Sequence, residues 1–303
     1  MRFMIVAATL AAIFLLPDTT ALAWGPGVHM AVGNWFLANL ECVAPEVGHL
    51  LSLNPGAFLY GSLAADIFIG KGSTFRPGHS HNWSTGLSLL AIADSPRTRA
   101  YAYGYLAHLA ADTVAHNHYV PGMMSALPNG GRLGHVYVEM QADALVRWDT
   151  RQALDLFRRP QHDTDGALLA TVRKHRLPFL LKKQVMMGHL TLCGRRRWGQ
   201  SLSTAERMFS LGHADFFRTM FILTVDAVGD FLANPGASRV MELDPIGSRP
   251  LGHVRSLPLR GRRQTRQEMT APCSLFPLPP QLQALHPVHC QYGNTTVPLL
   301  RAD

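Results

Sequence analysis

The sequence predicts a single all-α domain. Apolar residues recur at intervals of three and four from Trp24 to about Pro235, and few segments alternate with period two. Hydrophobic residues make up 47% of the 303 residues and charged residues 16%, so the chain can bury a large core and is not expected to be disordered. We find no repeat of fixed period. These observations favour one multi-helix domain over residues 24–240.

The expected helices follow one another, with Gly and Pro in the loops between them. The first periodic segment is Met30–Leu40. The next is Trp83–Ala93, which either Asn82 or Ser84 can cap. The longest is Thr98–Asn117. The others run from His135 to Leu156, near Leu168 to Leu192, and from Ala214 to Leu232, before the stop signal Asn234-Pro235-Gly236.

Residues 1–23 read as a secretory signal peptide. Arg2 supplies the positive start, and the apolar run that follows is too short for a comfortable membrane span. The run ends at Pro17, and Ala21-Leu22-Ala23 fits an A-x-A cleavage site. We therefore expect a secreted or periplasmic protein that begins at Trp24 after cleavage. An uncleaved anchor is the alternative.

The last part of the chain, 241–303, has a different composition. Nine of the twenty prolines lie beyond Asp244, and hydrophobic periodicity disappears. Arginines lie there without a nearby acid until Glu268, in a chain of net charge +8. We expect an irregular, flexible basic tail rather than a second domain. It either has no assigned role or contacts an anionic surface, such as that of a membrane.

Four cysteines follow the signal segment, and none forms a C-x-x-C pair, so a thiolate zinc site is not expected. In an exported protein one or two disulfides are one interpretation, and free buried thiols are the other. The four are Cys42, Cys193, Cys273 and Cys290.

The segment HLAADTVAHNH, residues 108–118, carries the strongest chemical signal. His108 and Asp112 lie four residues apart, so on a helix they share a face and can reach one metal ion. His135 and Glu139, in GHVYVE, repeat this spacing. One such pair is weak evidence in a chain with fifteen histidines, but two pairs and further ligand-type residues indicate a site for several metals. The further residues are His29, Asp66, His79, His81, His116 and His118.

In order and spacing, residues 24–139 resemble the bacterial zinc-dependent phospholipase C family, whose all-α fold is shared with fungal and plant single-strand nucleases. The resemblance rests on a Trp at the mature N-terminus, WGPGVH, SLAADIF, the HSHNW segment, His-x-x-x-Asp-x-x-x-x-x-His and Gly-His-x-x-x-Glu. It implies an all-α domain whose cleft holds three zinc ions.

The resemblance also implies which residues bind each ion. The first zinc would be held by Asp66, His79 or His81, His108 and Asp112. A close neighbour would be held by the amine and carbonyl oxygen of Trp24, by His29 and by Asp112, which bridges the two. The third would be held by His118, His135 and Glu139. His116 lies on the His108–Asp112 face but off the family's ligand position, so a supporting hydrogen bond is expected for it.

The chemistry that follows is zinc-dependent hydrolysis of phosphoesters. We expect a zinc-bound water between the ions bridged by Asp112 to attack phosphorus, with the third zinc neutralising the developing charge. Asp66 either orients and deprotonates this water or serves only as a ligand.

Three functions remain open at this stage. Glu139 at the last ligand position resembles the phospholipase branch, so phospholipase C action on phospholipid is the first interpretation. The five-residue step from Trp24 to His29 resembles the nucleases, so a single-strand nuclease or 3′-nucleotidase is the alternative, and only then is nucleic acid a partner. The third is a zinc-binding protein without catalytic activity.

Overall fold

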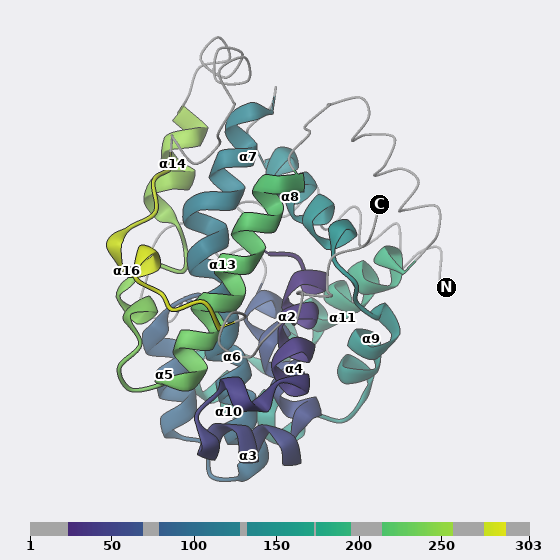
Figure 1. Cartoon of the computed structure of the whole chain (residues 1–303). Helices are drawn as coiled ribbons and strands as arrows, with labels where there is room; N and C mark the ends of the chain where they lie inside the picture. The colour runs from purple at the N-terminus through teal and green to yellow at the C-terminus, as the bar shows by residue number, and fades with distance from the viewer. Residues whose placement is uncertain are drawn as a thin grey trace.

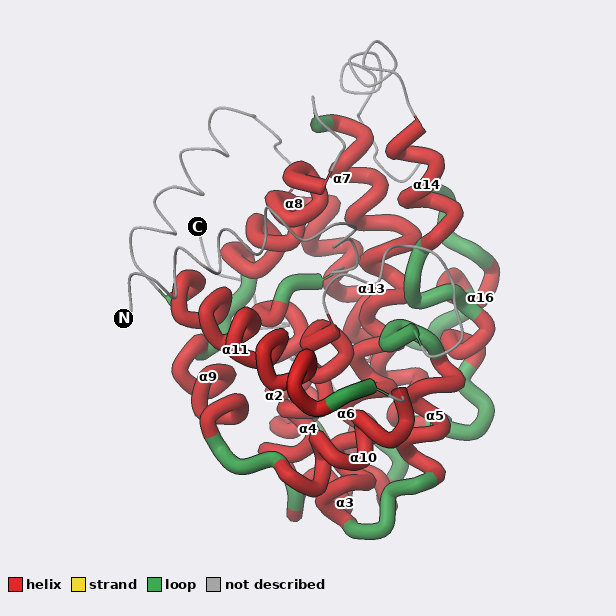
Figure 2. The backbone as a smooth tube through the Cα atoms, turned by 180° about the vertical axis from the view of Figure 1, so that it is seen from behind, coloured by secondary structure: helices red, strands yellow, loops and turns green. Residues whose placement is uncertain are grey.

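The computed structural model describes residues 24–68, 79–127, 132–172, 174–194, 214–256 and 276–288, and these ranges contain helices and no strands (Figures 1 and 2). The all-α prediction is therefore confirmed. None of the helices in these ranges combines the length and hydrophobicity that a transmembrane span requires. The expected signal peptide, residues 1–23, lies outside the described residues.

The main helices have bounds that partly differ from the predicted ones. They are α2 (Pro26–Ala38), α3 (Pro45–Leu53), α4 (Pro55–Ala64), α5 (Trp83–Ala91), α6 (Pro96–Val114), α7 (Val120–Ala126), α8 (Arg132–Leu145), α9 (Thr150–Arg158), α10 (His162–Val172), α11 (Arg176–Cys193), α13 (Ala214–Ala233), α14 (Ser248–Ser256) and α16 (Pro280–Gln283). The short elements are η1 (Leu40–Cys42), η2 (Ala65–Phe68), η3 (Ala115–Tyr119) and η4 (Arg239–Glu242).

Helix α6 forms the centre of the molecule and packs against α4 and α13 (Figure 1). Nearly every residue of α6 from Ala100 onward is buried. Two glycines allow its main chain to meet that of α4, because a Cβ on Gly61 would collide with the carbonyl oxygen of Tyr101, and one on Gly104 with that of Phe58. The position of α6 is therefore fixed closely relative to α4.

The helix predicted to end at Asn117 continues to Ala126, but with a change of winding. Residues 115–119 form the π-helical turn η3, and α7 follows directly. Pro121 lacks the N–H that would bond to the carbonyl of residue 117, so a regular α-helical ladder cannot cross this point. Short π-helical turns of this kind often occur at functional sites.

Two predicted helices are each divided in two. The segment from 135 to 156 contains α8 and α9, and the Asp149 side chain caps α9 by accepting a hydrogen bond from the main-chain N–H of Arg151 at 2.8 Å. The segment from 168 to 192 contains the end of α10 and most of α11. Pro178 is tolerated only in the first turn of a helix, so a new helix begins just before it.

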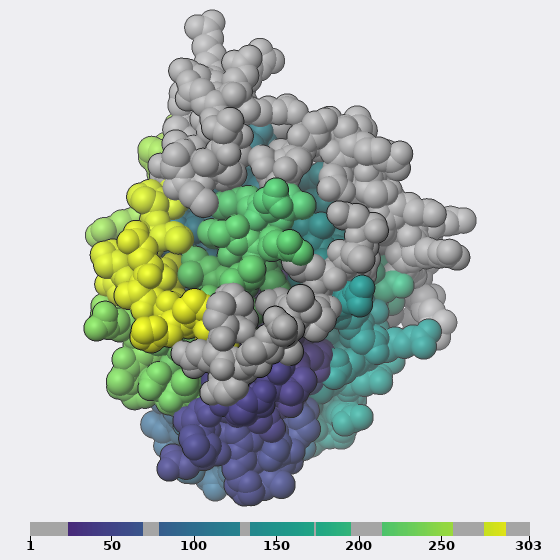
Figure 3. All heavy atoms as spheres, in the orientation of Figure 1, coloured from purple at the N-terminus to yellow at the C-terminus, as the bar shows by residue number. Residues whose placement is uncertain are grey.

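Part of the expected tail packs against the helical body. Helix α14 contacts η3 and α7, and Phe276, Leu282 and Val288 belong to the hydrophobic core. Figure 3 shows residues 276–288 on the surface beside α13 and α14. The main-chain N–H of Val288 donates to Asp226 Oδ1 at 2.9 Å. The domain boundary at residue 240 stays a prediction, and 257–275 and 289–303 lie outside the described residues.

Two of the four cysteines can be assigned. Cys42 and Cys193 are free thiols, one buried and one partly buried. Cys273 and Cys290 lie outside the described residues, so the prediction on disulfides stays open for them.

Candidate metal centre

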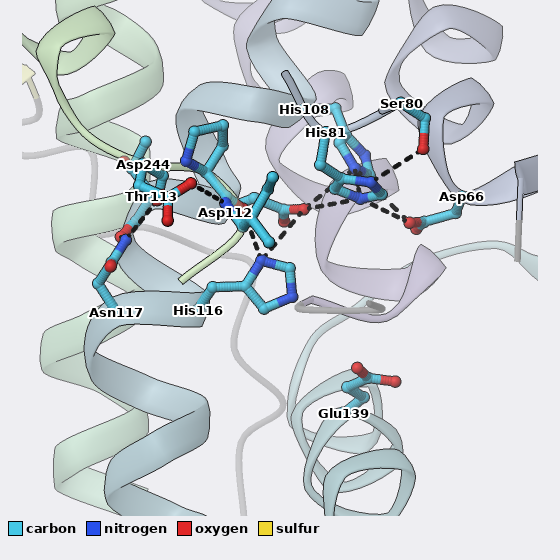
Figure 4. A network of polar contacts seen from close by, with 12 residues as sticks. Asp66, Ser80, His81, His108, Asp112, Thr113, His116, Asn117, Glu139 and Asp244 are labelled. Atoms are coloured by element: carbon cyan, nitrogen blue, oxygen red, sulfur yellow. Dashed lines mark hydrogen bonds and ion pairs between the residues drawn. The ribbon is translucent and has the colours of Figure 1, made fainter. Parts of the chain in front are cut away.

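The central feature of the site is a row of three buried side chains along α6 and η3. His108, Asp112 and His116 lie four residues apart and are no more than 1% exposed. Asp112 Oδ2 lies 3.2 Å from His108 Nε2 and 3.9 Å from His116 Nδ1. One carboxylate oxygen therefore faces two imidazoles from its own helix (Figure 4).

Two further segments bring Asp66 and His81 to this row. Asp66 lies in η2, directly after α4, and His81 lies in the loop before α5. His81 Nε2 is 3.2 Å from Asp66 Oδ1, 3.2 Å from Asp112 Oδ2 and 3.1 Å from His108 Nε2. Four ligand-type side chains from three parts of the chain thus converge on one buried point (Figure 4).

The structure distinguishes His81 from His79, which the sequence could not do. His79 Nδ1 accepts a hydrogen bond from the main-chain N–H of His81 at 3.0 Å, and the His79 carbonyl oxygen accepts one from Thr85 Oγ1 at 2.9 Å. His79 therefore shapes the loop, whereas the His81 ring enters the cluster with Asp66 and Asp112.

Helix α2 adds His29 on the opposite side of Asp112. His29 Nε2 lies 3.4 Å from Asp112 Oδ1, and its ring stacks on that of His108 with centroids 3.9 Å apart. Trp24 lies just before α2, with its indole fully buried against Tyr119 at a centroid distance of 4.6 Å. The two oxygens of Asp112 thus face different histidines.

Asp143 of α8 fixes the start of α2, and it was not predicted from the sequence. Its Oδ1 accepts a hydrogen bond from the main-chain N–H of Val28 at 3.0 Å, which replaces the side-chain cap that Gly25 cannot provide. Burial raises the pKa of Asp143 to about 7, although hydrogen bonds from Gly27 and Val28 act in the opposite direction. The available signal was its spacing, because His135, Glu139 and Asp143 lie four residues apart.

A second group of ligand-type residues lies beside the first. On α8, His135 Nε2 is 2.8 Å from Glu139 Oε1, and both residues are buried. The His116 ring lies 6.0 Å from the His135 ring and 6.0 Å from the His81 ring, measured between centroids. Figure 4 shows the His116 ring on the side of Asp112 that faces Glu139.

The structure brings the His116 ring toward the His135 ring. His118 Nδ1 lies 3.0 Å from the carbonyl oxygen of Phe276, so this imidazole donates to the segment that follows α14. The reason is the winding of the helix: four residues from Asp112 return to the same face, whereas six do not. The expectation that His118 joins His135 and Glu139 stays a prediction.

The buried acids and imidazoles shift one another's pKa values. Burial alone would lower the pKa of His81, but the close carboxylates of Asp112 and Asp66 raise it to about 9. Burial lowers the pKa of His116 to about 4, despite the nearby charge of Asp112. Burial raises the pKa of Glu139 well above its ordinary value, with a further contribution from Asp66. In all three groups burial disfavours the charged form, and only at His81 does the opposite charge of its neighbours outweigh burial.

Several buried polar atoms of the cluster lack a hydrogen bond. They are His29 Nε2, His116 Nε2, Asp66 Oδ2, Glu139 Oε1 and both carboxylate oxygens of Asp112. A buried polar atom left without a partner costs about 1–3 kcal/mol, so such a concentration requires a compensating group.

A divalent cation such as zinc fits these atoms. His108 Nδ1 lies 2.8 Å from the carbonyl oxygen of Ser62, and His116 Nδ1 lies 2.6 Å from that of Pro245. A carbonyl only accepts, so each Nδ1 carries the proton and each Nε2 presents a lone pair, as in metal-binding histidines. Two triads bring their ligand atoms within 4.8 Å of one another: His29, Asp66 and His108, and His81, His108 and Asp112.

Comparison with protein families supports this assignment. Residues 28–178 match the family model described as zinc dependent phospholipase C, a span that includes every described residue of the cluster from His29 to Glu139. No curated protein and no solved structure matches the chain. From this match and from the buried His and Asp cluster, we conclude that the chain belongs, through residues 28–178, to the zinc-dependent phospholipase C family.

Proposed function

We propose that the protein is a zinc-dependent phosphodiester hydrolase that acts as a phospholipase C on phospholipids. The observation that carries this proposal is the buried group formed by Asp66, His81, His108 and Asp112, whose unsatisfied acceptor atoms suit two close cations. Membership of the family supports a phospholipid as the substrate.

The proposed zinc ligands follow the geometry rather than the resemblance where the two differ. Asp66, His81, His108 and Asp112 would hold the first ion. His29, Asp112 and the main chain of Trp24 would hold the second. His116, His135 and Glu139 would hold the third. When bound, zinc supplies Lewis acidity for the phosphoryl oxygens and lowers the pKa of a bound water.

The side chains themselves have distinct tasks in this proposal. Asp112 presents one oxygen to His29 and the other to His81 and His108, so it serves both close sites. Asp66 has one oxygen 3.2 Å from His81 Nε2, and its buried Oδ2 has no hydrogen bond. We assign to Oδ2 the role of orienting the attacking water and holding its proton.

Export forms part of the same proposal, because the Trp24 amine becomes free only when residues 1–23 are removed. We expect the purified mature protein to begin at Trp24, as measured by intact mass. A variant whose Ala21 and Ala23 are replaced by bulky residues should retain its N-terminal segment and bind less zinc. A full-length chain with undiminished zinc content would contradict this role for Trp24.

A comparison of two substrates tests the activity. The mature protein is incubated with a phosphatidylcholine emulsion and with single-stranded DNA, each with and without a chelator. Release of diacylglycerol that the chelator abolishes supports the proposal. Release of nucleotides would instead identify a nuclease, and bound zinc without either product would identify a non-catalytic zinc protein.

A pair of matched variants tests the third ion. We expect His116→Ala to lose about one zinc per chain or to weaken its binding by about 10–100-fold, because it removes an imidazole whose Nε2 faces the cluster. His118→Ala should keep its zinc, since a position six residues from Asp112 lies off the helical face that carries His116. Metal analysis after dialysis measures both variants. If His118→Ala loses zinc and His116→Ala keeps it, His118 is the ligand of the third ion.

A further inference from the structure

The first turns of α11 expose three leucines on one side of the helix. Leu177 is 79% exposed, Leu181 68% and Leu180 41%. Their spacing of three and four places them on one helical face. Large hydrophobic side chains exposed to this extent are few among the described residues, and three of the six lie here. Such a concentration marks an interaction surface more often than chance.

Basic residues surround these leucines. Lys174, His175 and Arg176 are exposed and precede Leu177, and Lys182 follows Leu181. Burial, and after it the positive charge of Lys174, lower the pKa of Lys182, so the two ammonium groups lie near each other. Residues 174–182 contain no acid, so an anionic partner would relieve this repulsion.

The leucines are held on a rigid base. Phe179, which lies between Leu177 and Leu180 in the sequence, is buried. Its ring contacts that of Phe68 with centroids 5.5 Å apart. Lys183 turns inward, where its Nζ lies 2.8 Å from Asp165 Oδ2. The charge of Asp165 is thereby already paired and does not neutralise the exposed lysine and arginine. A fixed apolar surface loses little conformational entropy on binding.

A cavity lies beside this face. Its volume is about 300 Å³, and its walls include Arg176 and Leu180 together with Arg159 from the end of α9. This size and this combination of apolar and cationic groups suit a phosphate-bearing head group.

We propose that residues 174–182, the α11 face, dock the protein on a phospholipid bilayer, with Leu177, Leu180 and Leu181 in the interface and Lys174 and Arg176 against anionic lipid. Exposed apolar side chains flanked by cations are the pattern of peripheral membrane binding. The inference rests on the proposed function in one respect only, which is the choice of a phospholipid as the partner.

The α11 face is physically connected to the metal centre. Phe68, which supports Phe179, lies two residues after Asp66 in η2. At 1.5 Å per residue, α11 extends about 18 Å from Leu177 to His189, a half-buried imidazole influenced by Asp143 and Glu139. One helix thus joins the docking face to the cluster that would hydrolyse the lipid.

Vesicle flotation tests the docking directly. The zinc-loaded mature protein is mixed with vesicles of phosphonate analogues of phosphatidylcholine, whose P–C bond at the glycerol resists cleavage, with and without about a quarter of the phosphatidylserine analogue. We expect Leu177→Ser/Leu181→Ser to bind about tenfold more weakly than the parent on both. Lys174→Glu should bind at least about fivefold more weakly, mainly on the anionic vesicles.

Matched variants elsewhere on the surface control for folding and net charge. Leu53→Ser removes a leucine that is 67% exposed at the end of α3, and Arg239→Glu reverses an exposed charge in η4. Both should bind within about twofold of the parent protein. Equal binding by the α11 variants and the parent, or equal loss in the controls, would overturn the proposal, as would a loss of self-association in the leucine variant without loss of vesicle binding.

Activity on a soluble short-chain phosphatidylcholine separates this inference from the proposed function. We expect the α11 variants to keep the kcat/KM of the parent on this monomeric substrate. If the parent protein floats with vesicles but hydrolyses no lipid, the docking face stands and the proposed function fails. If it hydrolyses the monomer but no variant alters flotation, the docking face fails alone.

Discussion

Two buried polar clusters of this protein differ in one respect, namely whether the chain satisfies its own acceptors. Asp165 accepts from Tyr60 Oη at 2.6 Å and from Lys183 Nζ at 2.8 Å, and that ammonium lies 4.9 Å from the Tyr60 ring centroid. Asp112 is more deeply buried, yet neither of its oxygens has a hydrogen bond. In the first cluster, protein side chains supply the partners of the carboxylate. The second acquires its missing partners only when cations bind.

The largest effect should come from Asp112. Asp112→Asn removes the charge that faces His29, His81 and His108, so we expect at least about a 10³-fold loss of hydrolysis and a loss of about two zinc ions. Metal analysis and the diacylglycerol assay measure both. Full zinc content in this variant would show that Asp112 is not shared between two ions.

Breaking the other cluster should affect stability and leave the metal in place. Lys183→Met leaves the Asp165 carboxylate without its cation, which costs about 3–5 kcal/mol for a fully buried pair. Because these side chains are 10% and 16% exposed, we expect about 2–3 kcal/mol in urea unfolding. Unchanged zinc content is the other half of the expectation, and Lys183→Met/Asp165→Leu should recover part of the stability.

The pH dependence of zinc binding should reflect the proton on His81. Its pKa is raised to about 9, so the metal-free protein carries this proton at pH 7 and zinc must displace it. Affinity should rise about tenfold per pH unit from 7 toward 9, as measured by competition with a zinc indicator. The stability that this proton gives the metal-free fold should be complete below about pH 6.5 and lost as pH rises through 9.

The smallest effect concerns Asn82, which lies next to His81 in sequence. Its side chain accepts from the main-chain N–H of Ser84 at 3.1 Å and caps α5. Asn82→Ala should cost about 1 kcal/mol in unfolding without loss of zinc. Ser95→Ala, which removes the cap of α6, is the matched control. Loss of zinc from the Asn82 variant alone would place Asn82 in the metal centre.

The sequence predicts those site residues that lie four apart on one helix. His108 with Asp112 and His135 with Glu139 were identified because residues four apart share a face, and the all-α class follows from the same periodicity. His79 and His81 could not be separated, since both lie in a loop whose course depends on tertiary contacts. Their roles emerge only from the hydrogen bond that joins them.

Main-chain partners were also beyond reach. The residue types of Ser62, Pro245 and Phe276 do not indicate that their main-chain carbonyl oxygens accept hydrogen bonds from histidines. The π-helical turn that carries His116 and His118 likewise has only Pro121 as a local cause. Asp143 had a helical signal, but its task of capping α2 depends on two segments 115 residues apart.

The carbonyl oxygen of Pro245 has a consequence for how the protein can be divided. The family match ends at residue 178, and all the proposed side-chain ligands precede Met140. Yet His116 is oriented by Pro245, and Gly247, at a φ of 62°, lies so close to the His116 main chain that any Cβ would collide with it. The geometry of the site therefore depends on residues outside the matched region. A chain shortened at residue 240 would keep each proposed ligand and lose the group that aims one of them.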